Sequence, residues 1–242
     1  MCSINHNKKA IFIHINKTGG SYIATNLQKY YGFTNYYLKR PDHNQFCYKS
    51  NKNPNPKYKQ RSYENKIHGV LHYYRTSPHL NRRMNMDQYK WKTYFKFTFV
   101  RDPYDRVISG YNHLNPNNLD LGTYLKRKFL VNDLQYIHVF MPQIKHVYKA
   151  NLRFIGRFEN LENDFQKILH ILGFNKILHN PRIKINCRPH DNYKKYYNQE
   201  ILDLVNILFK NDFLNFKYKV YEKIEDLNTI NNEDTTIQHI IE

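Results

Sequence analysis

The chain has few of the residues and segments that mark disulfide-rich, zinc-binding or membrane proteins. Its 242 residues include three cysteines and one tryptophan. Cys2, Cys47 and Cys187 have no CxxC spacing, so we expect neither a disulfide framework nor a cysteine-based zinc site, which fits a reducing compartment. The sequence does not decide whether Cys47 and Cys187 form a disulfide bond. No apolar run approaches the roughly 20 residues of a membrane-spanning helix.

Signals for export and for catalytic metals are also missing. The N-terminal segment lacks the profile of a signal peptide, because its short apolar run at residues 11–15 is typical of a strand. We therefore expect a soluble, cytoplasmic protein without a membrane anchor. His68 and His72 are four residues apart, but neither an HExxH pattern nor an acidic third ligand accompanies them, so no metal site is expected.

Negative charge is scarce. Against 38 lysines and arginines stand 20 acidic residues, which gives a formal net charge of +18. The excess has two explanations: compositional drift, since lysine, asparagine, isoleucine and tyrosine are all abundant, or attraction of an anionic partner. The basic residues are spread along the chain and no nucleic-acid-binding motif accompanies them. This distribution favours compositional drift as the explanation, and we do not expect nucleic acid as a partner. An anionic acceptor substrate remains compatible with the charge.

Two segments far apart in the chain have the organisation of phosphate sites. In the first, an apolar strand at residues 11–15 leads into Lys17-Thr18-Gly19-Gly20-Ser21, and residues 22–30 have helical spacing. The glycines let the backbone approach an anion, while the lysine, the hydroxyl groups and the helix N-terminus attract it. The order differs from the GxxxxGK[ST] motif of nucleotide phosphotransferases, because here the lysine precedes the glycines. A tight turn with an incidental surface lysine is the alternative.

The second segment follows a predicted central strand, Tyr94–Val100. Arg101 stands where this strand ends, Asp102 is placed to cap a helix, and Pro103 suits the first helical position. Ser109 comes eight residues after the arginine, so the two side chains can hold one phosphate from two directions. The alternative is that Arg101 pairs with a carboxylate and that Ser109 only packs.

The two segments together resemble the cofactor-binding elements of sulfotransferases that use 3′-phosphoadenosine 5′-phosphosulfate (PAPS). KTGGS is similar to their 5′-phosphosulfate loop, and VRDPYDRVISGY is similar to their 3′-phosphate element. Residues 66–74 (KIHGVLHYY), 154–165 (FIGRFENLENDF) and 191–218, which end in a DFxxFxY pattern, resemble further segments of the carbohydrate sulfotransferase branch. The resemblance spans residues 11–218. Asn16 and Asp102 replace a proline and an asparagine that are common in the family, and neither change removes a phosphate-contacting group.

The resemblance implies a fold and an activity. The fold would be the three-layer, P-loop-like α/β fold of sulfotransferases, a central parallel sheet flanked by helices. The activity would be that of an EC 2.8.2-type enzyme, which moves a sulfuryl group from PAPS to a hydroxyl acceptor and releases adenosine 3′,5′-bisphosphate (PAP) without a metal. By resemblance to the carbohydrate branch, the acceptor is a saccharide. Two alternatives remain: a nucleotide-dependent phosphotransferase on a related fold, and a non-catalytic basic protein that binds polyanions.

Site residues follow from the same resemblance. Lys17 would stabilise charge on the bridging oxygen, and His68, or His72 in another register, would be the general base. The predicted cofactor-binding residues are Lys17, Thr18, Gly19, Gly20, Ser21, Arg101 and Ser109. Arg106 is expected to pair within its helix or with Asp102. For Arg157 and Glu159 the expected role is a buried ion pair beneath the sheet.

One domain is expected over residues 1–221, because 242 residues with 40% hydrophobic composition can build a single core. Residues 39–66 are polar and read as a long loop, which is a candidate for acceptor binding. After Tyr221 the charge turns negative, so residues 222–242 are predicted to form a flexible acidic tail. The sequence does not indicate which oligomeric state the protein adopts.

Overall fold

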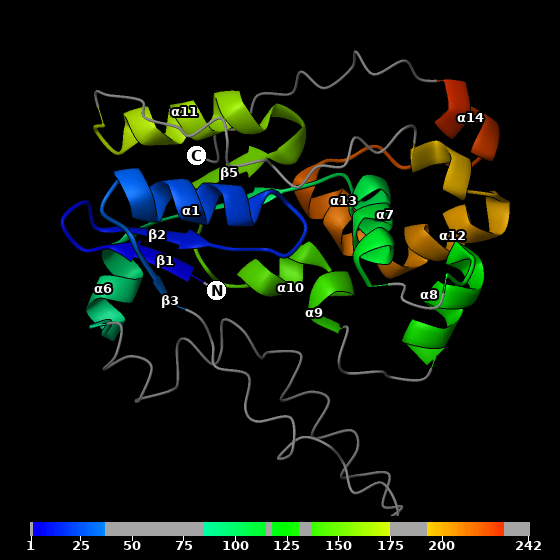
Figure 1. The fold of residues 1–242 in the computed structure, drawn as a ribbon, viewed down its shortest axis with the longest axis horizontal. Helices are drawn as coiled ribbons and strands as arrows, with labels where there is room; N and C mark the ends of the chain where they lie inside the picture. Colours follow the sequence, from blue (N-terminus) through cyan, green and yellow to red (C-terminus); the bar gives the residue numbers. More distant parts are fainter. Residues whose placement is uncertain (1, 37–84, 115–117, 131–136, 175–192, 230–242) are drawn as a thin grey trace, which may run out of the picture.

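The structure is a computed structural model that describes residues 2–36, 85–114, 118–130, 137–174 and 193–229 (Figure 1). The predicted loop 39–66, both candidate bases His68 and His72, and the cysteines Cys47 and Cys187 lie outside these residues. Among the helices of the described ranges, none combines the length and the hydropathy needed to cross a membrane.

A five-stranded sheet with the order β3-β1-β2-β4-β5 forms the centre of the fold. Its strands are β1 (Cys2–Asn5), β2 (Ala10–Ile13), β3 (Thr34–Tyr36), β4 (Phe95–Val100) and β5 (Phe154–Arg157). β2, β4 and β5 are parallel, whereas β1 runs antiparallel to both of its neighbours. The prediction of an α/β fold is confirmed, but the sheet is mixed, because the short turn between β1 and β2 permits only antiparallel pairing.

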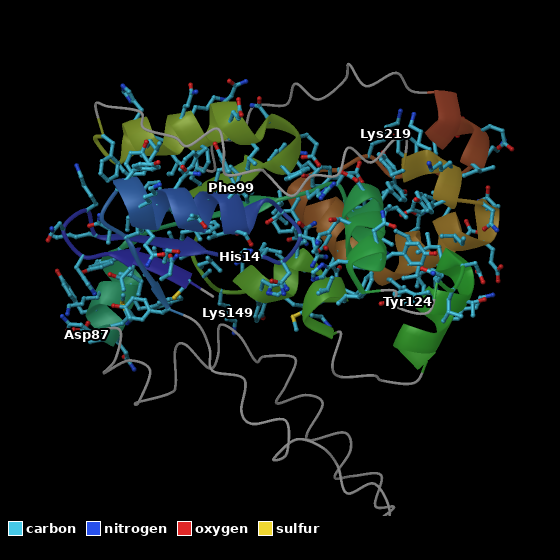
Figure 2. The ribbon with its side chains drawn as sticks, in the orientation of Figure 1. His14, Asp87, Phe99, Tyr124, Lys149 and Lys219 are labelled. Atoms are coloured by element: carbon cyan, nitrogen blue, oxygen red, sulfur yellow. The ribbon has the colours of Figure 1, made fainter. Side chains whose placement is uncertain are left out.

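Alternating side chains give the sheet two buried faces. Ala10 and Phe12 of β2 point to one face, which is covered by α1 (Gly20–Tyr30) and α11 (Leu161–Ile171). Ile11 and Ile13 point to the other, where they pack with residues of α6 (Gln88–Thr93), α10 (Gln143–Val147) and α13 (Lys210–Phe216). Figure 1 shows the resulting three layers, and in Figure 2 the Phe99 side chain lies in the upper interface.

A second group of helices packs beside the carboxyl ends of the parallel strands (Figure 1). It consists of α7 (Pro103–Leu114), α8 (Leu121–Leu130), α9 (Ile137–Phe140), α12 (Gln199–Leu208), α13 and α14 (Ile224–Thr229). Its core is aromatic and aliphatic, with Tyr104, Tyr124 and Phe213 fully buried. α14 occupies the start of the predicted acidic tail, and Leu227 of this helix is buried in the same core.

One buried carboxylate joins this helical group to the sheet. Asp212 of α13 accepts hydrogen bonds from the backbone N–H groups of Gln143 and Ile144, at 2.7 and 2.9 Å, where α10 begins. The Gln143 side chain in turn accepts from the N–H of Arg101 at 2.9 Å and donates to its carbonyl at 2.8 Å. The residue that follows β4 is thereby fixed by a chain of contacts that begins near the C-terminus of the fold.

Replacing Asp212 by alanine should destabilise the fold strongly. One buried and one partly buried N–H group would lose a charged acceptor, so the free energy of unfolding should fall by about 3 kcal/mol, measured by urea unfolding. Asp203→Ala removes an exposed carboxylate from α12 and should change stability by less than about 0.5 kcal/mol. Equal losses in the two variants would contradict the bridging role of Asp212.

Candidate functional site

The loop between β2 and α1 has the geometry of an anion site. Lys17 and Gly19 both adopt left-handed backbone conformations, with φ of 69° and 76°. A Cβ at residue 19 would also lie 3.0 Å from Leu161, so this position requires glycine. No side chain caps the N-terminus of α1. The first N–H groups of the helix therefore remain available to an anion.

The two hydroxyl residues of the loop differ in their surroundings. Thr18 is fully buried, and its hydroxyl donates to the carbonyl of Ile15 at 2.9 Å. This hydroxyl proton stabilises the turn itself, so a contact of Thr18 with a phosphate would have to come from its backbone N–H. Ser21 is exposed in the first turn of α1, where its hydroxyl can reach a ligand.

Two buried arginines hold this loop from the segment that follows β4. Arg106 donates from Nε to the carbonyl of Asn16 at 3.0 Å, and Arg101 donates from Nη1 to the carbonyl of Lys17 at 3.3 Å. Arg106 also binds the carbonyls of Val139 and Met141 through Nη2, at 2.8 and 3.0 Å. The expectation that Arg106 pairs within its helix or with Asp102 is therefore wrong, because its guanidinium satisfies backbone carbonyls of the loop, of Val139 in α9 and of Met141 just after this helix. Burial lowers the pKa of Arg106 to about 10, so it stays charged near neutral pH.

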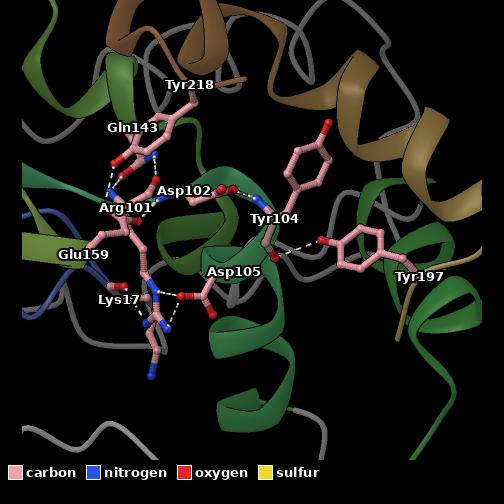
Figure 3. A network of polar contacts seen from close by, with 9 residues as sticks. All are labelled: Lys17, Arg101, Asp102, Tyr104, Asp105, Gln143, Glu159, Tyr197 and Tyr218. Atoms are coloured by element: carbon pink, nitrogen blue, oxygen red, sulfur yellow. Dashed lines mark hydrogen bonds and ion pairs between the residues drawn. The ribbon is translucent and has the colours of Figure 1, made fainter. Parts of the chain in front are cut away.

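Arg101 is tightly enclosed but keeps part of its binding capacity. Its Nε and Nη2 lie 2.7 and 2.6 Å from Oδ2 of Asp105 (Figure 3). Its guanidinium also stacks 3.9 Å from the ring centre of Phe158. A guanidinium has five N–H groups. Two point at Asp105 and one at the Lys17 carbonyl, which leaves two without a partner among the described residues. Arg101 therefore pairs with a carboxylate and also retains donors for an anion.

α7 starts as the sequence predicts and presents Ser109 on the side of the loop. Asp102 Oδ1 accepts the N–H of Tyr104 at 2.7 Å, which caps the helix, and Pro103 is its first residue. At about 100° per residue, Ser109 lies between Asp105 and Arg106 around the helix axis. Asp105 contacts Arg101, which binds the loop, and Arg106 binds the loop directly. Ser109 is 7% exposed, and no other described residue hydrogen-bonds to its hydroxyl.

The two predicted segments thus meet at one edge of the sheet. β2 and β4 are parallel neighbours, so the residues after them emerge side by side. A model of the family described as the sulfotransferase family matches residues 2–219. The chain belongs to the sulfotransferase family.

A second comparison gives a relative without an assigned function. An uncharacterized protein of Archaeoglobus fulgidus is 31% identical over 106 residues, which cover 42% of this chain and 84% of that protein. No solved structure matches the chain significantly. The family membership supports transfer of a sulfuryl group from a nucleotide donor to a hydroxyl acceptor, whereas the individual ligand roles of the site residues stay predictions.

Two histidines of this sulfotransferase, His14 and His113, were not predicted from the sequence as residues of the site. His14 stacks on Phe12 with ring centres 6.1 Å apart, next to the position where α1 begins (Figure 2). Burial lowers the pKa of His14 to about 3, so its imidazole is neutral. His113 lies on α7, and desolvation followed by the charge of Lys17 lowers its pKa. His14 could have been noticed because it interrupts an apolar strand. His113 could have been noticed because it follows Ser109 by four residues, which places both on the same side of a helix.

A buried acidic network supports the start of α7. Glu159 accepts the N–H of Asp102 at 2.6 Å through Oε1 and the hydroxyl of Tyr218 at 3.1 Å through Oε2. Arg157 stacks 4.3 Å from the ring centre of Tyr218 and donates to the carbonyl of Phe216 at 2.7 Å. The expected ion pair between Arg157 and Glu159 is not formed. Both residues contact Tyr218 instead: its hydroxyl donates to Glu159, and its ring stacks against the guanidinium of Arg157.

The electrostatics of this network favour a neutral Asp102. Burial, and next the charge of Glu159, raise the pKa of Asp102 from 3.8 to about 8. Burial also raises the pKa of Glu159 itself. A carboxyl group that is protonated near neutral pH removes one negative charge from the neighbourhood of Arg101, which favours an anionic ligand there.

Asp102→Asn should make the fold less sensitive to rising pH. The folded-state pKa lies above the unfolded value, so the stability contributed by the protonated carboxyl is full below about pH 4 and is lost as pH rises toward 8. Asparagine caps a helix as well as aspartate. At pH 8 the variant should be more stable than the wild type by at least about 1.4 kcal/mol, the equivalent of one pKa unit, in urea unfolding at pH 4, 6 and 8.

Asp120→Asn provides the control for this pH dependence. Asp120 is an exposed carboxylate at the start of α8 that accepts the N–H of Thr123 at 2.9 Å. Its replacement should leave the loss of stability between pH 4 and 8 unchanged. An unchanged loss in Asp102→Asn would show that this carboxyl is ionised in the folded protein at neutral pH.

Gly20 should tolerate no side chain while His14 is present. A Cβ at residue 20 would lie 1.8 Å from Cδ2 of His14. Gly20→Ala should therefore lower the free energy of unfolding by about 1–3 kcal/mol, as overpacking does. In the double variant with His14→Ala, the total loss should be smaller than the sum of the two single losses.

Gly122→Ala is the matched helical control. A Cβ at residue 122 of α8 would have no neighbour nearer than 3.4 Å. Alanine should be neutral there or should stabilise the protein by up to about 1 kcal/mol. Strict additivity of Gly20→Ala and His14→Ala would refute the contact between the imidazole and the helix start.

Proposed function

We propose that this sulfotransferase uses PAPS as donor and transfers its sulfuryl group to a hydroxyl of a saccharide. The observation that carries the proposal is the contact between the two predicted phosphate elements. Arg101 binds the carbonyl of Lys17 and still has two guanidinium N–H groups without a described partner. One anion position next to the uncapped start of α1 and another next to Arg101 and Ser109 suit a nucleotide with phosphates at its 5′ and 3′ positions.

The protein groups of this site fit the needs of the donor. Lys17 would stabilise the negative charge that develops on the oxygen between phosphorus and sulfur, a type of contact worth about 3–4 kcal/mol in other enzymes. The first N–H groups of α1, with Gly19, Gly20 and Ser21, would hold the 5′ group. Arg101 and Ser109 would hold the 3′-phosphate. The contacts of Arg101 support its assigned role, since Phe158 and Asp105 hold its guanidinium in one orientation.

The reaction also needs a proton acceptor for the attacking hydroxyl. By resemblance to the carbohydrate branch, His68 or His72 would take this proton while the hydroxyl oxygen forms a bond to sulfur and the bond from sulfur to the PAP oxygen breaks. No metal is required by this step. The saccharide acceptor rests on the same resemblance, and a sulfation assay with PAPS and a panel of neutral and anionic saccharides would identify it.

Selective stabilisation by PAP tests the donor site. PAP at a hundredfold over its dissociation constant should raise the free energy of unfolding by about 2.7 kcal/mol, read as a thermal shift at two salt concentrations. ADP, which lacks the 3′-phosphate, should stabilise the protein far less. Equal shifts would point to a generic nucleotide site or a phosphotransferase, and the absence of a shift with both would favour a polyanion-binding protein.

Ser109→Ala refines the same experiment. The loss of one hydrogen bond to a phosphate should weaken PAP by about 1.5 kcal/mol, roughly tenfold, without weakening ADP. Thr123→Ala, at an exposed position of α8, should leave the affinity for both nucleotides unchanged. The same loss for PAP and ADP in Ser109→Ala would contradict a contact with the 3′-phosphate.

A further inference from the structure

His113 is placed by α7 on the side of the loop that carries Lys17. It follows Ser109 by four residues, so it lies one turn further along the same side of the helix. At about 100° per residue, its direction also falls between those of Asp105 and Arg106, the two residues of α7 that connect to the loop. Unlike Ser109, His113 is exposed to solvent and is therefore accessible to a ligand.

Lys17 extends toward the same stretch of the helix. Its backbone carbonyl is held by Arg101, two residues before α7, and in Figure 3 its side chain points away from that contact, in the direction in which α7 runs. The positive charge of Lys17 acts on the His113 imidazole and, after desolvation, is the second cause of its lowered pKa. In the free protein, the charge of Lys17, the lysine proposed to bind the donor, therefore disfavours protonation of the His113 imidazole.

We propose that His113 takes up a proton when the anionic donor binds beside Lys17, and that the resulting imidazolium contacts the 5′ end of the donor. The inference rests on the proposed donor site. The proton comes from solvent and binds the unprotonated ring nitrogen, and no bond of the donor is broken in this step. His113 would then add a positive charge next to the transferred group without acting as the base of the reaction.

Electrostatics determine the sign of the effect. In the free protein, the neighbouring ammonium opposes a second positive charge on the imidazole. Phosphate charges of a bound donor offset the ammonium, so the pKa of His113 should rise on binding. PAP affinity should therefore gain from His113 at low pH and lose this gain as pH rises through the pKa of the complex.

The elements that pack against α7 also carry charged groups. The helix packs against α9 and against the short 3₁₀ helix Tyr193–Tyr196, which carries Lys194 and Lys195. Arg101 and Asp105 stand at the start of α7 itself and neutralise one another. Lys17 is the charged group that shifts the pKa of His113, and α9 contributes no charged side chain among those described.

Calorimetry of PAP binding to the wild type and to His113→Gln tests the proposal. Titrations at pH 6, 7 and 8, each in two buffers of different ionisation enthalpy, give the affinity and the number of protons taken up. The wild type should take up more protons than His113→Gln at pH 6 to 7. It should also bind PAP more tightly at pH 6, by at most about tenfold for each unit by which binding raises the pKa, and equally at pH 8. Both phosphates of PAP, at the 3′ and 5′ positions, titrate with a second pKa of about 6 in either experiment, so only the difference between the two proteins is used.

Two further measurements exclude a merely structural effect. His170→Gln replaces an exposed histidine of α11 and should leave the proton uptake of the wild type unchanged. In the ligand-free protein, Lys17→Ala should raise the pKa of His113, followed by NMR of the imidazole C–H resonances. An unchanged NMR midpoint would contradict the coupling between the two residues.

The outcomes separate a failure of the proposed role of His113 from a failure of the proposed donor site. Equal proton uptake by the wild type and His113→Gln, with PAP still bound, would overturn the role of His113 and leave the donor site intact. A wild type that does not bind PAP would instead refute the proposed donor, and the inference would fall with it.

Discussion

The arrangement of the site depends on two buried guanidinium groups that bind the carbonyls of consecutive residues in one loop. Arg106 holds Asn16 and Arg101 holds Lys17, so the turn after β2 is attached to the turn after β4. Buried arginines are costly unless their N–H groups are satisfied, and here backbone carbonyls and Asp105 satisfy most of them. The loop is therefore held in its left-handed conformation before any ligand arrives.

The remaining structure supports this connection. Residues near the C-terminus reach the same place by two routes: Asp212 through Gln143 to the backbone of Arg101, and Tyr218 through Glu159 to the backbone of Asp102. Such a network keeps the donors of the site within a fixed geometry, which is what electrostatic stabilisation of a transferred anion requires. A protonated Asp102 limits the negative charge close to Arg101. The residues that stabilise this part of the fold are thus the same ones to which the proposal assigns anion binding.

Much of this site could be predicted from local patterns. The apolar runs ended where a lysine and an arginine stood, and both turns led into helices, as the structure confirms for α1 and α7. Asp102 was correctly identified as a cap because capping needs only contacts within one turn. The partners of Arg106, Arg157 and Glu159 were predicted wrongly, since these side chains bind residues far away in sequence, through backbone groups and a tyrosine that no local spacing reveals.

Local patterns in the sequence were sufficient to predict the family, the class of fold and the two segments that meet after β2 and β4, because strand patterns, turn glycines and capping residues act over a few neighbouring positions. The antiparallel pairing of β1, the hydrogen bond of the Thr18 hydroxyl within the turn, and the position of His14 beside the start of α1 follow only from the tertiary structure. These outcomes depend on which surfaces meet when the sheet and the helical group pack together. Burial and the field of distant charges, which set the pKa of Asp102 and of His113, exist only after that packing.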